Sequence, residues 1–128
     1  MGQFKPADFS RGDPNTIGGY MAVHDRPAAF EGSDGASYST ELVVDKTQDD
    51  AAPFGGYILF IRWGQGEPFA SGHLETPYLF YANTEEEARS MVSQLPLSSV
   101  KKLLDGLIAA RAQSSRPWWE VMHEEGPM

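Results

Sequence analysis

The chain has 128 residues, of which 41% are hydrophobic and 22% charged, a composition that predicts one ordinary globular domain. It contains no cysteine, which excludes disulfides, thiolate zinc sites, iron–sulfur clusters and a cysteine nucleophile. Its net charge of −8 repels phosphate backbones and anionic lipids, so we expect no nucleic-acid partner and no membrane partner.

The hydropathy pattern favours a cytoplasmic protein. No apolar run approaches the roughly 20 residues that span a bilayer. The N-terminal stretch MGQFKPADFSRGDPN has no apolar core of the kind found in secretory signals. We therefore expect a cytoplasmic location.

The first half of the chain predicts an irregular arm followed by strands. Residues 1–17 are rich in glycine, proline and polar groups, which is typical of an N-terminal arm with little regular structure. The sequence GGYMAVH at 18–24 predicts a short strand that ends before Pro27. A glycine-rich turn at 31–35 precedes residues 38–44, where apolar and polar residues alternate as in a half-buried strand.

The most hydrophobic part of the chain is the predicted central strand at 57–63, YILFIRW. Successive side chains of a strand point to opposite faces, and both faces of this one are mainly apolar. The pattern predicts a strand covered on both sides. Arg62 within it needs either an edge position or a carboxylate partner, for which Glu41 and Glu75 are candidates.

Residues 64–68 predict a turn, and residues 69–75 a less apolar strand. Thr76-Pro77 then interrupts the pairing, because proline has no N–H to donate. Residues 78–81 predict either a last strand or a continuation beyond a bulge.

Two amphipathic helices are predicted after the sheet. Thr84 followed by Glu87 forms a capping box for a helix at about 85–95. Ser98 or Ser99 caps a second helix at about 99–112, whose apolar residues recur with helical spacing. Beyond it, residues 114–128 predict an irregular C-terminal tail.

Together these segments predict a single α+β domain over residues 18–113. Its antiparallel sheet of four to five strands spans about residues 18–82, and two C-terminal helices follow. We expect the first helix on one sheet face, and the arm, the second helix, the tail or a dimer partner on the other.

Candidate site residues are few. His73 and Glu75 lie two positions apart on a predicted strand, so their side chains share a face. His24 and Asp25 would complete an acid–base or metal site if their strand were adjacent, because zinc, iron and manganese accept histidine and carboxylate ligands. No cofactor is expected, since no phosphate-binding loop or zinc-protease motif is present.

The leading functional hypothesis is a non-catalytic accessory or regulatory module that binds another protein. It rests on the acidic charge and on Trp118 and Trp119, because tryptophan is enriched at binding hot spots. The partner is another protein or a second copy of the chain. The alternative is a small enzyme or ligand-binding domain with a pocket near His24, His73, Glu75 and Tyr78.

Overall fold

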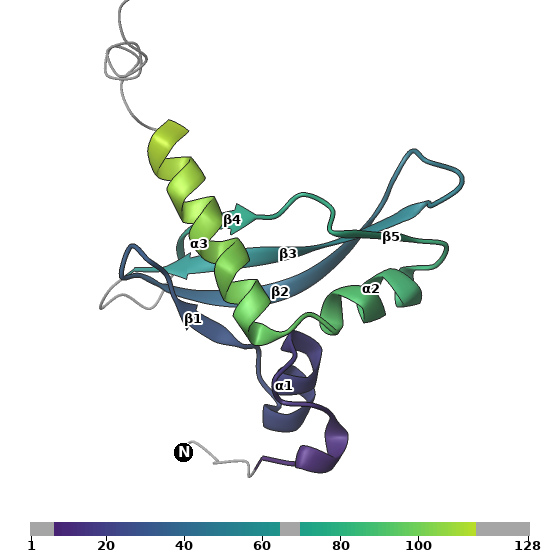
Figure 1. Cartoon of the computed structure of the whole chain (residues 1–128), viewed down its shortest axis with the longest axis horizontal. Coiled ribbons are helices and arrows are strands. Elements are labelled where there is room, and N and C mark those ends of the chain that lie inside the picture. Colours follow the sequence, from purple (N-terminus) through teal and green to yellow (C-terminus); the bar gives the residue numbers. More distant parts are fainter. Residues whose placement is uncertain (1–6, 65–69, 115–128) are drawn as a thin grey trace, which may run out of the picture.

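The computed structural model describes residues 7–64 and 70–114 of the chain. This part forms an antiparallel sheet accompanied by helices, which confirms the predicted α+β fold and its two C-terminal helices (Figure 1). The elements, in chain order, are the short 3-10 helix η1 (Phe9–Arg11), α1 (Ile17–His24), β1 (Ala29–Glu31), β2 (Ser37–Lys46), β3 (Phe54–Trp63), β4 (Ala70–Glu75), β5 (Phe80–Ala82), α2 (Glu85–Ser93) and α3 (Leu97–Ser114).

The sheet is organised around β3. One edge of β3 pairs with the whole of β2, from Ser37 opposite Trp63 to Lys46 opposite Phe54. Its other edge pairs first with β5 and then with β4. Thr76 lies between these two short strands, and its Oγ1 accepts a hydrogen bond of 3.1 Å from the N–H of Ile58. β4 and β5 are therefore two parts of one interrupted edge strand, as the Thr76-Pro77 pair suggested.

The prediction of a strand at residues 18–24 is wrong, because this segment forms α1. Thr16 caps the helix, with its Oγ1 accepting from the N–H of Gly19 at 3.0 Å. Asp25 ends it in the left-handed conformation, with φ of 55°. Ile17, placed in the irregular arm by the sequence, is fully buried, and its N–H donates to the carbonyl of Leu95 at 2.9 Å. A tertiary contact thus secures a helix that two glycines would weaken in isolation.

The two C-terminal helices begin close to where the sequence places them. Thr84 caps α2 as predicted, and its Oγ1 accepts from the N–H of Glu87 at 3.0 Å. α2 ends at Ser93, two residues before the predicted end. α3 begins at Leu97, so Ser98 lies in its first turn instead of serving as its cap.

Both helices pack on the same face of the sheet. α3 crosses in front of the strands in Figure 1, and α2 lies beside it. The core between these layers contains the fully buried side chains of Ile58, Phe60, Val92, Val100 and Leu104.

The helix layer approaches the sheet closely at Gly56. A Cβ atom added to Gly56 would lie 2.7 Å from Cγ2 of Val92, so only glycine leaves room for α2 on β3.

The expectation that β3 is covered on both faces is wrong for the described part of the chain. Ile58 and Phe60 have no exposed surface, whereas the alternate residues Tyr57, Leu59 and Ile61 are half-buried and Trp63 is 36% exposed. No helix of the described ranges covers that second face (Figure 1). Within residues 7–64 and 70–114 the sheet is therefore part of a two-layer structure with one face open.

One-sided burial predicts unequal costs for truncating neighbouring residues of β3. We expect Phe60→Ala to lower the free energy of unfolding by about 3–5 kcal/mol, because it leaves a cavity in the core. Leu59→Ala should cost about 1 kcal/mol, because Leu59 is only partly removed from water. Chemical denaturation of both variants measures the difference. Equal losses would show that the second face is covered in solution.

Candidate functional site

The uncovered side of the sheet forms one continuous surface, which we call the open face. Residues from β2, β3, β4 and the β4–β5 connection point to it, and the edge strand β5 extends it. Its side chains are Ser39, Glu41, Val43, Asp45, Tyr57, Leu59, Ile61, Trp63, His73, Glu75, Tyr78 and Tyr81.

Specific contacts hold the large side chains of the open face in place. The indole N–H of Trp63 donates to Oγ of Ser39 at 3.0 Å across the β2–β3 pair. At the opposite end of β3, the rings of Tyr57 and Tyr78 meet edge to face with centroids 5.8 Å apart. Amphipathic rings held in this way, with one surface in contact with solvent, are typical of protein-binding surfaces.

The open face is hollowed over β3 and its edge with β4 and β5, and a further concavity of about 430 Å³ on the β2 side is lined by Ser39, Glu41 and Ile61 together with Met21 and Arg89. Leu59, Ile61, His73 and Glu75 line a concavity of about 450 Å³ over β3 and β4. A second concavity of about 380 Å³ lies next to it, and it is lined by Asp45, Tyr57, Glu75, Thr76, Pro77, Tyr78 and Tyr81. Glu75 borders both, so together they form an interrupted groove along β3.

The charge of the open face is negative. Glu41, Asp45 and Glu75 are exposed on it, and its defining side chains include no lysine or arginine. Partial burial raises the pKa of Tyr57, and the negative charge of Asp45 and Glu75 raises it further. The pKa of Tyr78 is raised in the same way, by desolvation and then by Asp45, whose Oδ2 accepts a hydrogen bond from the Tyr78 hydroxyl at 3.3 Å. Both tyrosines thus lie in a negative electrostatic potential.

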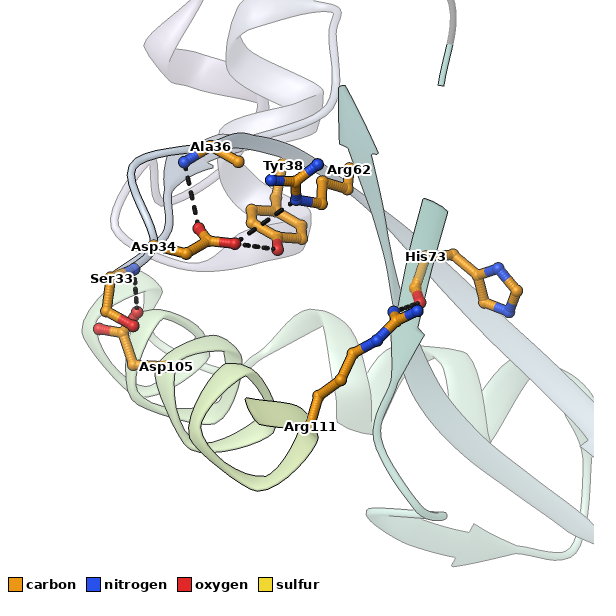
Figure 2. A network of polar contacts seen from close by, with 8 residues as sticks. All are labelled: Ser33, Asp34, Ala36, Tyr38, Arg62, His73, Asp105 and Arg111. Atoms are coloured by element: carbon orange, nitrogen blue, oxygen red, sulfur yellow. Dashed lines mark hydrogen bonds and ion pairs between the residues drawn. The ribbon is translucent and has the colours of Figure 1, made fainter. Parts of the chain in front are cut away.

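The basic side chains of Arg62 and Arg111 make their polar contacts on the helix side of the sheet (Figure 2). Arg62 points to this side, and its Nε lies 3.4 Å from Oδ2 of Asp34. The predicted partners Glu41 and Glu75 are wrong, because they lie on the open face while Arg62 points away from it. Asp34 also accepts from the hydroxyl of Tyr38 at 2.9 Å and from the N–H of Ala36 at 3.1 Å.

Further polar contacts tie α3 to the sheet. Asp105 accepts from the N–H of Ser33 at 3.0 Å, and Lys101 donates to the carbonyl of Glu31 in β1 at 2.6 Å. Near the end of the helix, Nη1 of Arg111 donates to the carbonyl of His73 at 3.1 Å (Figure 2). This bond occupies a carbonyl of the edge strand β4 and shields that edge from pairing with another chain.

A cavity of about 330 Å³ is lined by Asp34, Tyr38, Arg62 and Arg111, together with apolar residues of β4 and α3. Its charged groups bond to one another or to the backbone, as the contacts above describe. We therefore assign this network a structural role in docking α3.

The structure separates the predicted site residues into two groups. His73 and Glu75 share the open face, as their spacing predicted, and the His73 ring points away from Arg111 (Figure 2). His24 lies on α1, where its ring packs against Tyr20 and Phe9 with centroid distances of 4.4 and 6.1 Å. Asp25 is the left-handed residue that ends that helix. Because 18–24 is helical, it cannot bring His24 to β4 as a neighbouring strand.

The described ranges 7–64 and 70–114 contain no group of three or more histidine, aspartate or glutamate side chains placed to hold a metal ion. The hypothesised set of His24, His73 and Glu75 is therefore not assembled. Trp118 and Trp119 lie outside the described residues. Among the helices of those ranges, none has both the length and the apolar composition needed to cross a bilayer.

Comparison of the chain with protein-family models, with curated proteins and with solved structures finds no match.

Several residues of the open face were missed as functional candidates, notably Asp45, Tyr57, Trp63 and Tyr81. A signal for them was present in the sequence. The side chains that flank Leu59 and Ile61 on neighbouring strands are the polar residues Glu41, Ser39, Glu75 and His73. Polar neighbours on both sides indicate a face in contact with water, even when the central strand is apolar.

The Asp34 network predicts a pH-dependent contribution to stability. Desolvation tends to raise the pKa of Asp34, but the bonds from Ala36, Tyr38 and Arg62 outweigh it and leave the pKa lowered. A lowered pKa in the folded state stabilises the protein above the unfolded-state pKa, and this stabilisation is lost as the pH falls below about 4.

We expect Asp34→Asn to reduce the free energy of unfolding by about 1 kcal/mol at neutral pH. The difference from the unsubstituted protein should shrink as the pH falls through the acidic range. Denaturation at a series of pH values measures it, with Asp50→Asn, in an exposed loop residue, as the matched control. A difference that stays constant with pH would contradict this role.

Proposed function

We propose that this protein is a non-catalytic module that binds another protein through the open face of its sheet. The observation that supports this proposal most directly is the uncovered side of β3, where four large apolar or aromatic side chains line one face: Tyr57, Leu59, Ile61 and Trp63. A contiguous apolar surface with a polar border is typical of protein interaction sites.

Charge selects the class of partner. The border of the open face is formed by Glu41, Asp45 and Glu75. A partner surface with lysine or arginine around an apolar centre complements both features. Such complementarity favours fast association and excludes acidic competitors.

The same charge argument disfavours two other occupants. A second copy of the chain would place carboxylates against carboxylates in a symmetric contact. The C-terminal residues 115–128 contain one arginine and three glutamates, a formal charge of 1 − 3 = −2, so their composition offers no basic excess to complement the negative border. A separate, basic protein is the occupant that the open face fits best.

The module hypothesis also agrees with the separation of His24 from His73 and Glu75. The enzyme alternative places a pocket near His24, His73, Glu75 and Tyr78. His73 and Glu75 remain together in one concavity, but its other lining residues, Leu59, Ile61 and Gly72, have no titratable side chain. General acid–base chemistry needs further groups within hydrogen-bond reach of a substrate in a site that excludes water.

Charge reversal on the open face tests the proposal. We expect Glu41→Lys/Glu75→Lys to abolish binding of the basic partner, because it replaces attraction by repulsion. The control Asp50→Lys/Glu86→Lys makes the same change of net charge on exposed residues outside the open face and should still bind. Affinity capture with each protein, followed by quantitative comparison of the bound proteins, measures the effect.

Binding to the unsubstituted protein should also weaken as ionic strength rises, because screening shortens the range of the charges. Equal capture by both double variants would contradict a role for the open face.

The assignment to a separate partner makes a prediction about oligomeric state. We expect sedimentation equilibrium to give a monomer at physiological ionic strength, because like charges oppose a symmetric dimer through the open face. A dimer that Ile61→Lys converts to monomer would show that the face is a contact between copies instead.

A further inference from the structure

Three tyrosine rings converge at the end of the open face where β3 begins. Tyr57 comes from β3, Tyr78 from the β4–β5 connection and Tyr81 from β5. The rings of Tyr57 and Tyr78 are inclined at 68°, and those of Tyr78 and Tyr81 at 62° with centroids 5.7 Å apart. The three inclined rings line one small volume, the concavity of about 380 Å³ described above.

Two carboxylates, Asp45 and Glu75, line the same concavity. Neither a lysine nor an arginine of the described residues is among its lining groups. The face of an aromatic ring carries partial negative charge and attracts cations. The rings and the carboxylates thus both attract a positive charge. Together they make this end of the open face a site for a cation. We refer to it as the tyrosine pocket.

Close packing and hydrogen bonds support the tyrosine pocket from beneath. Tyr78 lies directly on Gly55, where an added Cβ atom would be 2.6 Å from Cδ1 of the ring. Thr76 is buried and donates to the carbonyl of Pro77 at 2.8 Å, and the N–H of Leu79 donates to the carbonyl of Gly56 at 2.8 Å. One of these bonds lies just before Tyr78 in the chain and the other just after it, so both fix the β4–β5 connection that carries the ring. A ring that is already in position loses little conformational entropy on binding.

We propose that the tyrosine pocket binds the ammonium group of a lysine side chain on the protein that docks at the open face. This proposal rests on the proposed function and names the chemistry of one anchor of that partner. A compact ammonium fits between rings that are inclined to one another, whereas a planar guanidinium prefers to stack flat on one ring. An ammonium also keeps N–H groups to donate to Asp45 and Glu75, and a quaternary cation has none.

The experiment uses two small probes, Nα-acetyl-lysine amide and Nα-acetyl-norleucine amide. They share an aliphatic side chain, and only the first is charged. The full chain is titrated with each probe, and NMR follows the ring signals of Tyr57, Tyr78 and Tyr81. We expect the lysine probe to shift these signals in a saturable way and the norleucine probe to leave them unchanged.

Substitutions at Tyr78 provide the matched comparison. Tyr78→Phe keeps the ring and should bind the lysine probe within about twofold of the unsubstituted protein, whereas Tyr78→Leu should bind about two- to fivefold more weakly, as expected for one exposed cation–π contact. Asp45→Asn should weaken binding by a similar factor without removing a ring. Gly55→Ala, which displaces the Tyr78 ring, should resemble Tyr78→Leu. Thermal unfolding establishes that each variant is folded.

The proposal is overturned if both probes shift the tyrosine signals equally, or if Tyr78→Leu binds the lysine probe as well as Tyr78→Phe does. Its failure is distinguishable from failure of the proposed function. If Glu41→Lys/Glu75→Lys abolishes partner capture but Tyr78→Leu has no effect on capture or on the probe, the open face is the binding surface and the tyrosine pocket is not its lysine site.

Discussion

The close contact between the helix layer and one face of β3 is the constraint on which the rest of this structure depends. Ile58 and Phe60 are fully buried beneath helices, and Gly56 allows α2 to approach the strand at van der Waals distance. Both C-terminal helices pack on this side. The described part of the chain therefore provides no helix to cover the opposite face of the sheet. The apolar side chains of the opposite face remain at the surface as a consequence.

The distribution of charge follows the same division. On the helix side, Arg62 pairs with Asp34 of the β1–β2 turn, and Lys101 and Arg111 of α3 donate to the carbonyls of Glu31 and His73, which ties the helix to the sheet. On the open face, carboxylates surround tyrosine and aliphatic side chains without a basic residue among the defining set. The open face thus combines apolar surface with carboxylates that no basic residue of its defining set offsets. This combination supports our proposal of a basic partner with a lysine anchor.

Much of the fold could be predicted from local patterns. The alternation at Tyr38, Thr40 and Leu42 correctly indicates a half-buried strand, and the Thr84 cap correctly indicates where α2 begins. The helix at 17–24 could not be identified in this way. Its two glycines weaken the helical pattern, and its stability depends on contact between Ile17 and the connection that precedes α3, about 80 residues further along the chain. For the candidate site, the shared face of His73 and Glu75 followed from their spacing, but their distance from His24 did not.

By itself, the sequence determined the class of the fold, the antiparallel pairing of the central strands and the acidic character of the molecule, because strand periodicity, helix caps and charge are local properties. Only the tertiary structure decided that both helices cover the same face of the sheet and that Tyr57, Tyr78 and Tyr81 converge at one end of the other. The physical reason is that the sequence of an apolar strand face is the same whether helices of the same chain cover it or a partner protein does. The choice depends on how residues distant in the chain pack together.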